Sequence, residues 1–138
     1  MNSAIIGVGS NIDAHVNIER AGEILAKDQK VIKRSAFAET KPVDIPVNTP
    51  VNTNEQPDFL NGAFLIETEL DMVRLKGYLK EVEVKLGRPL AKDRSGPRTI
   101  DLDIIVFNGE IVSSDFELYA FVKDAVLELA PELGEPKG

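Results

Sequence analysis

The sequence has no cysteine and a single histidine, His15, among its 138 residues. The lack of cysteine excludes a disulfide framework, a thiolate zinc site and a cysteine nucleophile. A bound metal ion would therefore be held by oxygen atoms or by this one imidazole. Because His15 falls in the first turn of an expected helix, we expect its side chain to be exposed and not to act as a catalytic base.

Long apolar runs and positive charge are also scarce. No apolar run approaches the roughly 20 residues that cross a bilayer, and the N-terminus does not combine a basic start with an apolar stretch. We therefore expect a soluble, cytoplasmic protein with no membrane partner. The net charge of −7 argues against a nucleic-acid partner, but a local basic cluster could still attract a small anion.

The composition that remains, 43% hydrophobic and 28% charged residues, predicts one compact domain over residues 1–138, which we expect to be a monomer. Apolar spacing and turn residues predict the order β-α-β-β-α-β, followed by a hairpin and a short helix. This order is typical of a ferredoxin-like α+β sandwich with an antiparallel sheet. The predicted strands span residues 4–9, 31–39, 59–68, 100–107 and 110–113, the predicted helices span 13–27, 71–86 and 121–129, and a mobile tail spans 134–138.

Two polar segments separate these elements. Residues 41–56 contain three prolines and three asparagines, which exclude both a helix and an interior strand. Residues 88–98 concentrate positive charge on Arg88, Lys92, Arg94 and Arg98. We expect both segments to be active-site loops. A disordered insertion is the alternative for the first, and solvated surface cations are the alternative for the second.

An acidic pair follows the basic segment. Asp101 and Asp103 alternate along a predicted strand, so both carboxylates lie on one face, about 7 Å apart at their Cα atoms, with apolar residues behind them. Carboxylates that converge in this way suit Mg²⁺, which takes one or two of them and completes its octahedron with water and phosphate oxygens. The alternative is a pair of aspartates neutralised by Arg98 or Lys92.

Two other positions point to a bound ligand. Phe59 and Asn61 share a face of one predicted strand, where a ring and an amide could hold the face and edge of a planar heterocycle. The alternative places Phe59 in the core and Asn61 in solvent. Glu83 lies in the last turn of a predicted helix, where the helix dipole disfavours a negative charge. It has a functional role, or it is a solvated glutamate near Lys80.

Four stretches together resemble the 6-hydroxymethyl-7,8-dihydropterin pyrophosphokinase family. The stretches are Gly9-Ser10-Asn11, Gln56-Pro57-Asp58-Phe59-Leu60-Asn61, Gly87-Arg88 and Gly96-Pro97-Arg98-Thr99-Ile100-Asp101-Leu102-Asp103. Their order and spacing agree over about residues 4–112. The resemblance implies an enzyme of folate biosynthesis that moves a pyrophosphoryl group from ATP to the pterin hydroxymethyl oxygen and releases AMP. It also implies the ferredoxin-like fold.

The resemblance also implies roles for individual residues. Asp101 and Asp103 would bind two Mg²⁺ ions, and Arg88 and Arg98 would contact the phosphates of ATP from a mobile loop. The remaining ATP contacts would come from Glu83, Lys92 and Ile104. The pterin would be held by the backbone of Thr40, Pro42 and Val43, by Asn61 at its edge, and by Phe59 and Phe121 on its two faces.

The sequence departs from the family pattern near the expected ATP phosphates. The segment between Glu117 and Phe121 lacks the usual Pro-His pair and arginine, and Leu90 and Ser95 replace an arginine and an aromatic residue. These changes predict weaker nucleotide binding or slow turnover. Two alternatives follow: a non-catalytic pterin- or nucleotide-binding relative, and a metal-free interaction domain.

Overall fold

The computed structural model of the protein describes residues 1–40, 59–87 and 100–134. Within these residues, six strands form one sheet in which all neighbours are antiparallel, with the order β2-β4-β1-β5-β6 and with β3 beside β4. The α+β fold predicted from the sequence is therefore confirmed. The elements are β1 (Asn2–Ser10), α1 (Ala14–Asp28), β2 (Lys30–Arg34), β3 (Ala38–Thr40), β4 (Phe59–Thr68), α2 (Met72–Lys85), β5 (Asp101–Phe107), β6 (Glu110–Ile111), α3 (Asp115–Leu118), α4 (Ala120–Leu129) and a 3₁₀ turn, η3 (Pro131–Gly134).

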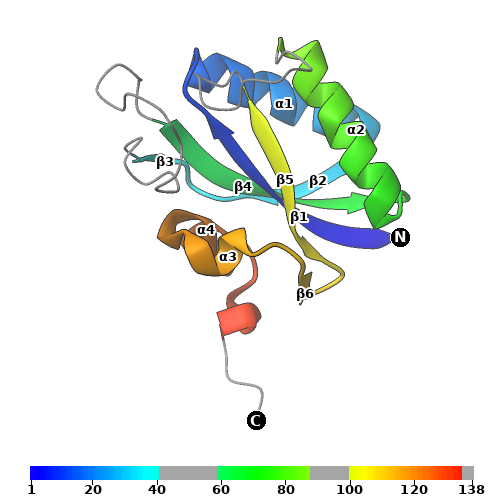
Figure 1. The fold of residues 1–138 in the computed structure, drawn as a ribbon. Coiled ribbons are helices and arrows are strands. Elements are labelled where there is room, and N and C mark those ends of the chain that lie inside the picture. The colour runs from blue at the N-terminus through cyan, green and yellow to red at the C-terminus, as the bar shows by residue number, and fades with distance from the viewer. Residues whose placement is uncertain (41–58, 88–99, 135–138) are drawn as a thin grey trace.

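The helices α1 and α2 lie together on one face of the sheet (Figure 1). Both carry apolar residues at helical spacing, and those residues are buried against the strands, as the sequence predicts. The helix residues of this cluster are Ile18, Ala21, Leu25, Leu75, Leu79 and Val82. This face of the sheet is therefore filled by the main core.

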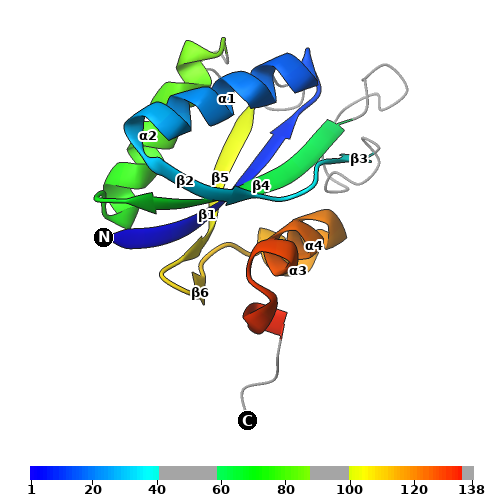
Figure 2. The same cartoon turned by 180° about the vertical axis from the view of Figure 1, so that it is seen from behind.

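The opposite face is covered in part by α3 and α4, as the reverse view shows (Figure 2). A second apolar cluster joins these helices to the sheet through Phe116, Val126, Ile5 and Ile105. The strand β5 contributes to both clusters. Leu102 packs on the face covered by α1 and α2, and Ile105 packs on the face covered by α3 and α4. β5 therefore contributes apolar side chains to the core on both faces of the sheet.

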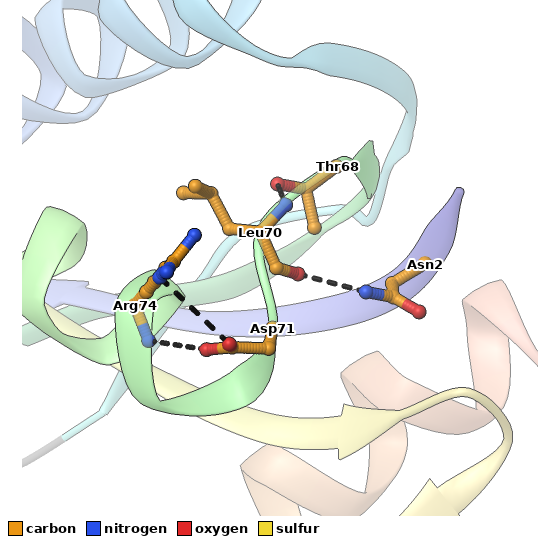
Figure 3. Close-up of polar contacts among 5 residues, drawn as sticks. All are labelled: Asn2, Thr68, Leu70, Asp71 and Arg74. Carbon is orange, nitrogen blue, oxygen red and sulfur yellow. Dashed lines mark hydrogen bonds and ion pairs between the residues drawn. The ribbon is translucent and has the colours of Figure 1, made fainter.

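The corner between β4 and α2 is fixed by short polar contacts (Figure 3). Asp71 caps α2 by accepting a 2.8 Å hydrogen bond from the Arg74 amide, and it lies 3.9 Å from the Arg74 guanidinium. The Thr68 hydroxyl accepts from the Leu70 amide, and the Leu70 carbonyl accepts from Nδ2 of Asn2 at 2.8 Å. These contacts anchor the start of α2 to the first residue of β1.

One predicted strand, residues 31–39, is broken in the structure into β2 and β3. Arg34 pairs with Phe64 and Ala38 with Asn61, so this side carries one more residue than β4. At the break, Ser35 donates its amide to the Ala63 carbonyl, and its hydroxyl accepts from the Ala63 amide at 2.8 Å. The extra residue is therefore accommodated as a bulge.

The other differences concern the ends of elements. The N-cap of α1 is Asp13, with a φ of 43° and no side-chain cap bond, and the Ser10 hydroxyl donates to the Ile12 carbonyl. The helix α3 was not predicted, and β6 is shorter than the predicted 110–113. The predicted tail begins late, because Gly134 belongs to η3, and its remainder, 135–138, lies outside the described residues. No helix among the described residues is long and apolar enough to cross a membrane.

Candidate active site

The candidate site lies on the sheet face opposite α1 and α2, at the end of β1 that leads to α1. Three residues form a row there, because Gly9 of β1 pairs with Asn61 of β4 on one side and with Asp101 of β5 on the other. Two residues earlier in β1, Gly7 pairs with Asp103. Since the two central positions are glycines, the amide on β4 and the carboxylates on β5 are separated by bare backbone rather than by side chains.

The amide of Asn61 leans over this bare backbone. A Cβ atom at Gly9 would lie only 2.5 Å from Oδ1 of Asn61, so the glycine is what lets the amide occupy its position. Nδ2 of Asn61 donates to the Thr40 hydroxyl at 2.6 Å, and Thr40 is paired with Phe59. Asn61 and Phe59 are each half-buried. Phe59 is therefore not fully buried in the core, and Asn61 is not fully exposed to solvent.

The two aspartates lie on the site face of β5, as their alternation predicts. Asp101 is half-buried and Asp103 is exposed, while Ile100 and Leu102 are buried among the residues of the main core. Each aspartate also makes a polar or electrostatic interaction of its own. Among the described residues, no three acidic or histidine side chains gather into a metal-binding group. The donor set fits Mg²⁺, which needs only one or two carboxylates when phosphate and water supply the other ligands.

A third carboxylate, which sequence reasoning missed, lies near this pair. Burial raises the pKa of Asp115 in α3, and the negative charge of Asp101 raises it further. Asp115 in α3 is therefore close enough to Asp101 in β5 for the two carboxylates to repel each other. No sequence pattern indicated it, since a four-residue helix has no periodicity and only the fold brings α3 beside β5.

Glu83 is not the solvated glutamate that its position in the last turn of α2 favours. Its side chain is only 7% exposed, and Oε2 accepts a 2.7 Å hydrogen bond from the backbone amide of Leu102. Leu102 lies between the two aspartates. The buried carboxylate therefore contacts the strand that carries the candidate metal ligands.

The remaining predicted site residues divide into two groups. Phe121, in the first turn of α4, is half-buried, and its ring stacks on Tyr119 with centroids 5.3 Å apart and planes at 29°. Ile104 packs against the main core. Lying outside the described residues are Pro42, Val43, Arg88, Lys92 and Arg98, together with the predicted loops 41–56 and 88–98. No contact between the basic segment and the aspartates is described here.

Comparison with known proteins identifies the family. Residues 5–131 match the family model described as 7,8-dihydro-6-hydroxymethylpterin-pyrophosphokinase (HPPK). The chain belongs to the HPPK family. Its relatives include the 2-amino-4-hydroxy-6-hydroxymethyldihydropteridine pyrophosphokinases of Methylorubrum extorquens, 34% identical over 96% of this chain and 85% of the relative, and of Bacillus subtilis, 36% identical over 83% of this chain and 65% of the relative.

Some HPPK relatives are considerably longer than this chain. The bifunctional protein FolKE of Lactococcus lactis is 30% identical over 94% of this chain, but the match covers only 43% of the relative. The chain therefore spans less than two thirds of this protein and of the Bacillus subtilis one. The similarity extends over nearly all of the present sequence, and it includes the strands that carry Asn61, Gly9 and Asp101.

Proposed function

We propose that this protein transfers a pyrophosphoryl group from ATP to the hydroxymethyl oxygen of 6-hydroxymethyl-7,8-dihydropterin and releases AMP, as a step of folate biosynthesis. The observation that carries the proposal is the row Asn61, Gly9 and Asp101, on three adjacent strands of a chain that belongs to the HPPK family. An amide suited to a heterocycle edge and a carboxylate suited to a cation thus flank one stretch of strand that carries no side chain.

The pterin would bind on the β4 side of this stretch. The Asn61 amide offers a donor and an acceptor, and its bond to Thr40 restricts its rotation before the ligand arrives. Phe59 shares the site face with Asn61 and would cover one side of the ring, with Phe121 of α4 on the other side. Backbone contacts from Thr40, Pro42 and Val43 complete the subsite in this proposal.

The triphosphate of ATP would bind on the β5 side. Asp101 and Asp103 would hold two Mg²⁺ ions, which when bound would offset the phosphate charge and lower the pKa of the attacking hydroxyl. Arg88 and Arg98 would contact the phosphates, and the nucleotide would also contact Glu83, Lys92 and Ile104. The row geometry supports this division, because the aspartates are separated from Asn61 by the width of one strand, so that hydroxyl and phosphate can meet above Gly9.

The residues described here position the reactants, and no side chain is required as a covalent nucleophile. The pterin hydroxyl oxygen would attack the β-phosphorus directly, and the bond from that phosphorus to the oxygen bridging to the α-phosphate would break, leaving AMP. Asn61 would fix the ring, and hence the direction of the hydroxymethyl group, relative to Asp101 and Asp103. We also propose a monomeric, cytoplasmic, single-domain enzyme.

The test follows the label in two ATP samples, one carrying ³²P at the β and the other at the γ position. Pyrophosphoryl transfer places both labels in the pterin product and releases AMP, whereas simple phosphoryl transfer places only the γ label there and releases ADP. Saturating magnesium and pterin are supplied in both cases. Absence of labelled pterin and of AMP would overturn the proposal, and pterin binding by calorimetry without turnover would identify a non-catalytic relative.

A further inference from the structure

Among the described residues, β5 is paired over only part of its length on its outer edge. On its inner side β5 pairs with β1 along its whole length, from Asp101 to Phe107. On its outer side β6 pairs only with Val106 and Phe107, and one further bond runs from the Val112 amide to the Ile105 carbonyl. On this outer side, no strand among the described residues lies beside the segment that holds the two aspartates.

Glu83 occupies the place of a neighbouring strand at this edge. Backbone amides in an antiparallel strand point alternately to either side, and that of Leu102 points outward, to Oε2 of Glu83 at 2.7 Å. The bond is buried, and Glu83 itself is held on α2 beside Val82 and Leu79, which pack in the main core. A carboxylate acceptor makes this a charge-assisted hydrogen bond from a rigid helix to the strand.

We propose that Glu83 is a positioning residue for the metal ligands Asp101 and Asp103, an inference that rests on the proposed function. The direction of the Leu102 amide depends on the backbone torsions between Asp101 and Leu102. Fixing that amide on the outer side therefore helps to fix the orientation of Asp101 relative to Asp103, in addition to the pairing with β1 on the inner side. This role differs from a contact between Glu83 and the nucleotide, because it acts through the strand and is present before ATP binds.

The experiment compares three substitutions. Glu83→Leu removes the acceptor, Glu83→Gln keeps an acceptor oxygen at the same reach, and Glu81→Leu is the matched control at an exposed position on the same helix. Two readouts require no turnover. Hydrogen exchange at the Leu102 amide is followed by NMR, and Mn²⁺ binding is followed by electron paramagnetic resonance in the presence of a non-hydrolysable ATP analogue.

In Glu83→Leu we expect exchange at Leu102 to become at least tenfold faster and Mn²⁺ binding to become at least fivefold weaker. In Glu83→Gln both effects should shrink to less than half, and Glu81→Leu should change neither. If Glu83→Leu does not fold, Glu83→Asp replaces it, since the shorter side chain cannot reach the amide and should act in the same direction.

Two results would overturn the role. One is unchanged Mn²⁺ binding in Glu83→Leu despite faster exchange, which would make the bond purely structural. The other is a loss in Glu83→Gln as large as in Glu83→Leu, which would show that the charge and not the acceptor matters, as in a direct substrate contact. If the unsubstituted protein proves inactive in the label-transfer assay, the proposed function fails separately, because neither readout here depends on turnover.

Discussion

The two ends of β1 are built in opposite ways. At its first end, Asn108 accepts from the Ser3 amide at 2.8 Å and donates to Asn2, which in turn donates to the Leu70 carbonyl. At its other end, Gly7 and Gly9 have no side chains, and the neighbouring strands place an amide and two carboxylates on one face beside them. Polar groups hold elements together at the first end, and at the second they flank two glycines.

A single strand can therefore take part in stabilising contacts at one end and in the candidate site at the other. Substitutions at the first end should reduce the free energy of unfolding and spare catalysis, because no proposed ligand contact lies there. Substitutions at the second end should impair ligand binding or turnover and spare stability. Four experiments, in order of decreasing effect, test this contrast.

The largest effect should come from removing a carboxylate at the open end. Asp103→Ala should lower kcat/KM for pyrophosphoryl transfer by at least about 100-fold, since the proposed function makes this carboxylate a metal ligand. Because Asp103 is exposed, the free energy of unfolding should change by less than about 0.5 kcal/mol. Steady-state kinetics and urea unfolding measure the two quantities. Asp124→Ala, at an exposed position in α4, is the control and should change neither.

Adding one methyl group at the same end should have a smaller effect. In Gly9→Ala the new Cβ would displace the Asn61 amide, and we expect KM for the pterin to rise by about tenfold, roughly the cost of one hydrogen bond. Gly77→Ala is the control: no atom lies within 4 Å of its added Cβ, and an alanine there should stabilise α2 by about 0.5–1 kcal/mol. An unchanged pterin KM in Gly9→Ala would contradict the assigned position of Asn61.

The corner at the opposite end should respond in stability alone. Asp71→Ala removes the cap that accepts from the Arg74 amide, and it should lower the free energy of unfolding by about 1 kcal/mol. Chemical denaturation measures this loss, and kcat/KM under native conditions should remain within about twofold of the unsubstituted value. A large loss of activity in a folded Asp71→Ala protein would mean that the two ends of β1 are coupled and do not act separately.

The smallest effect is expected at an exposed ion pair on the side of α1. The hydrogen bond and charge of Arg34, 2.8 Å away, lower the pKa of Glu19 below its usual value of 4.5. A carboxyl whose pKa is lowered by folding stabilises the native state above its unfolded pKa, and the contribution disappears as the pH falls through the folded pKa. Glu19→Gln should therefore cost at most about 0.5 kcal/mol at pH 7 and nothing at pH 2, by urea unfolding.

Much of the fold could be predicted because its signals are local. The spacing of Leu75, Leu79 and Val82 placed one face of α2 in the core, and Gly87 ends that helix region with a φ of 101°. The bounds of β4 were predicted without error. The break between β2 and β3 could not be predicted, since it depends on hydrogen bonds from Ser35 to Ala63 on a strand that is distant in sequence.

The site could be predicted only in its parts. Alternation along β5 placed Asp101 and Asp103 on one face, and this is confirmed, whereas their metal-binding role stays a prediction. That Asn61 and Asp101 flank the same glycine depends on β1 lying between β4 and β5, which is a property of strand order. The burial of Glu83 was missed for a similar reason, because its partner Leu102 comes from a separate part of the chain.

The bulge at Ser35 determines which side chain of β3 lies next to the Asn61 amide. If the ladder continued from Arg34 without the bulge, Phe37 would pair with Asn61, and the acidic Glu39 would take the place of Thr40 opposite Phe59. The extra residue thus places a neutral hydroxyl instead of a carboxylate next to the Asn61 amide. The chemical character of this part of the candidate site is set by strand register as well as by side-chain identity.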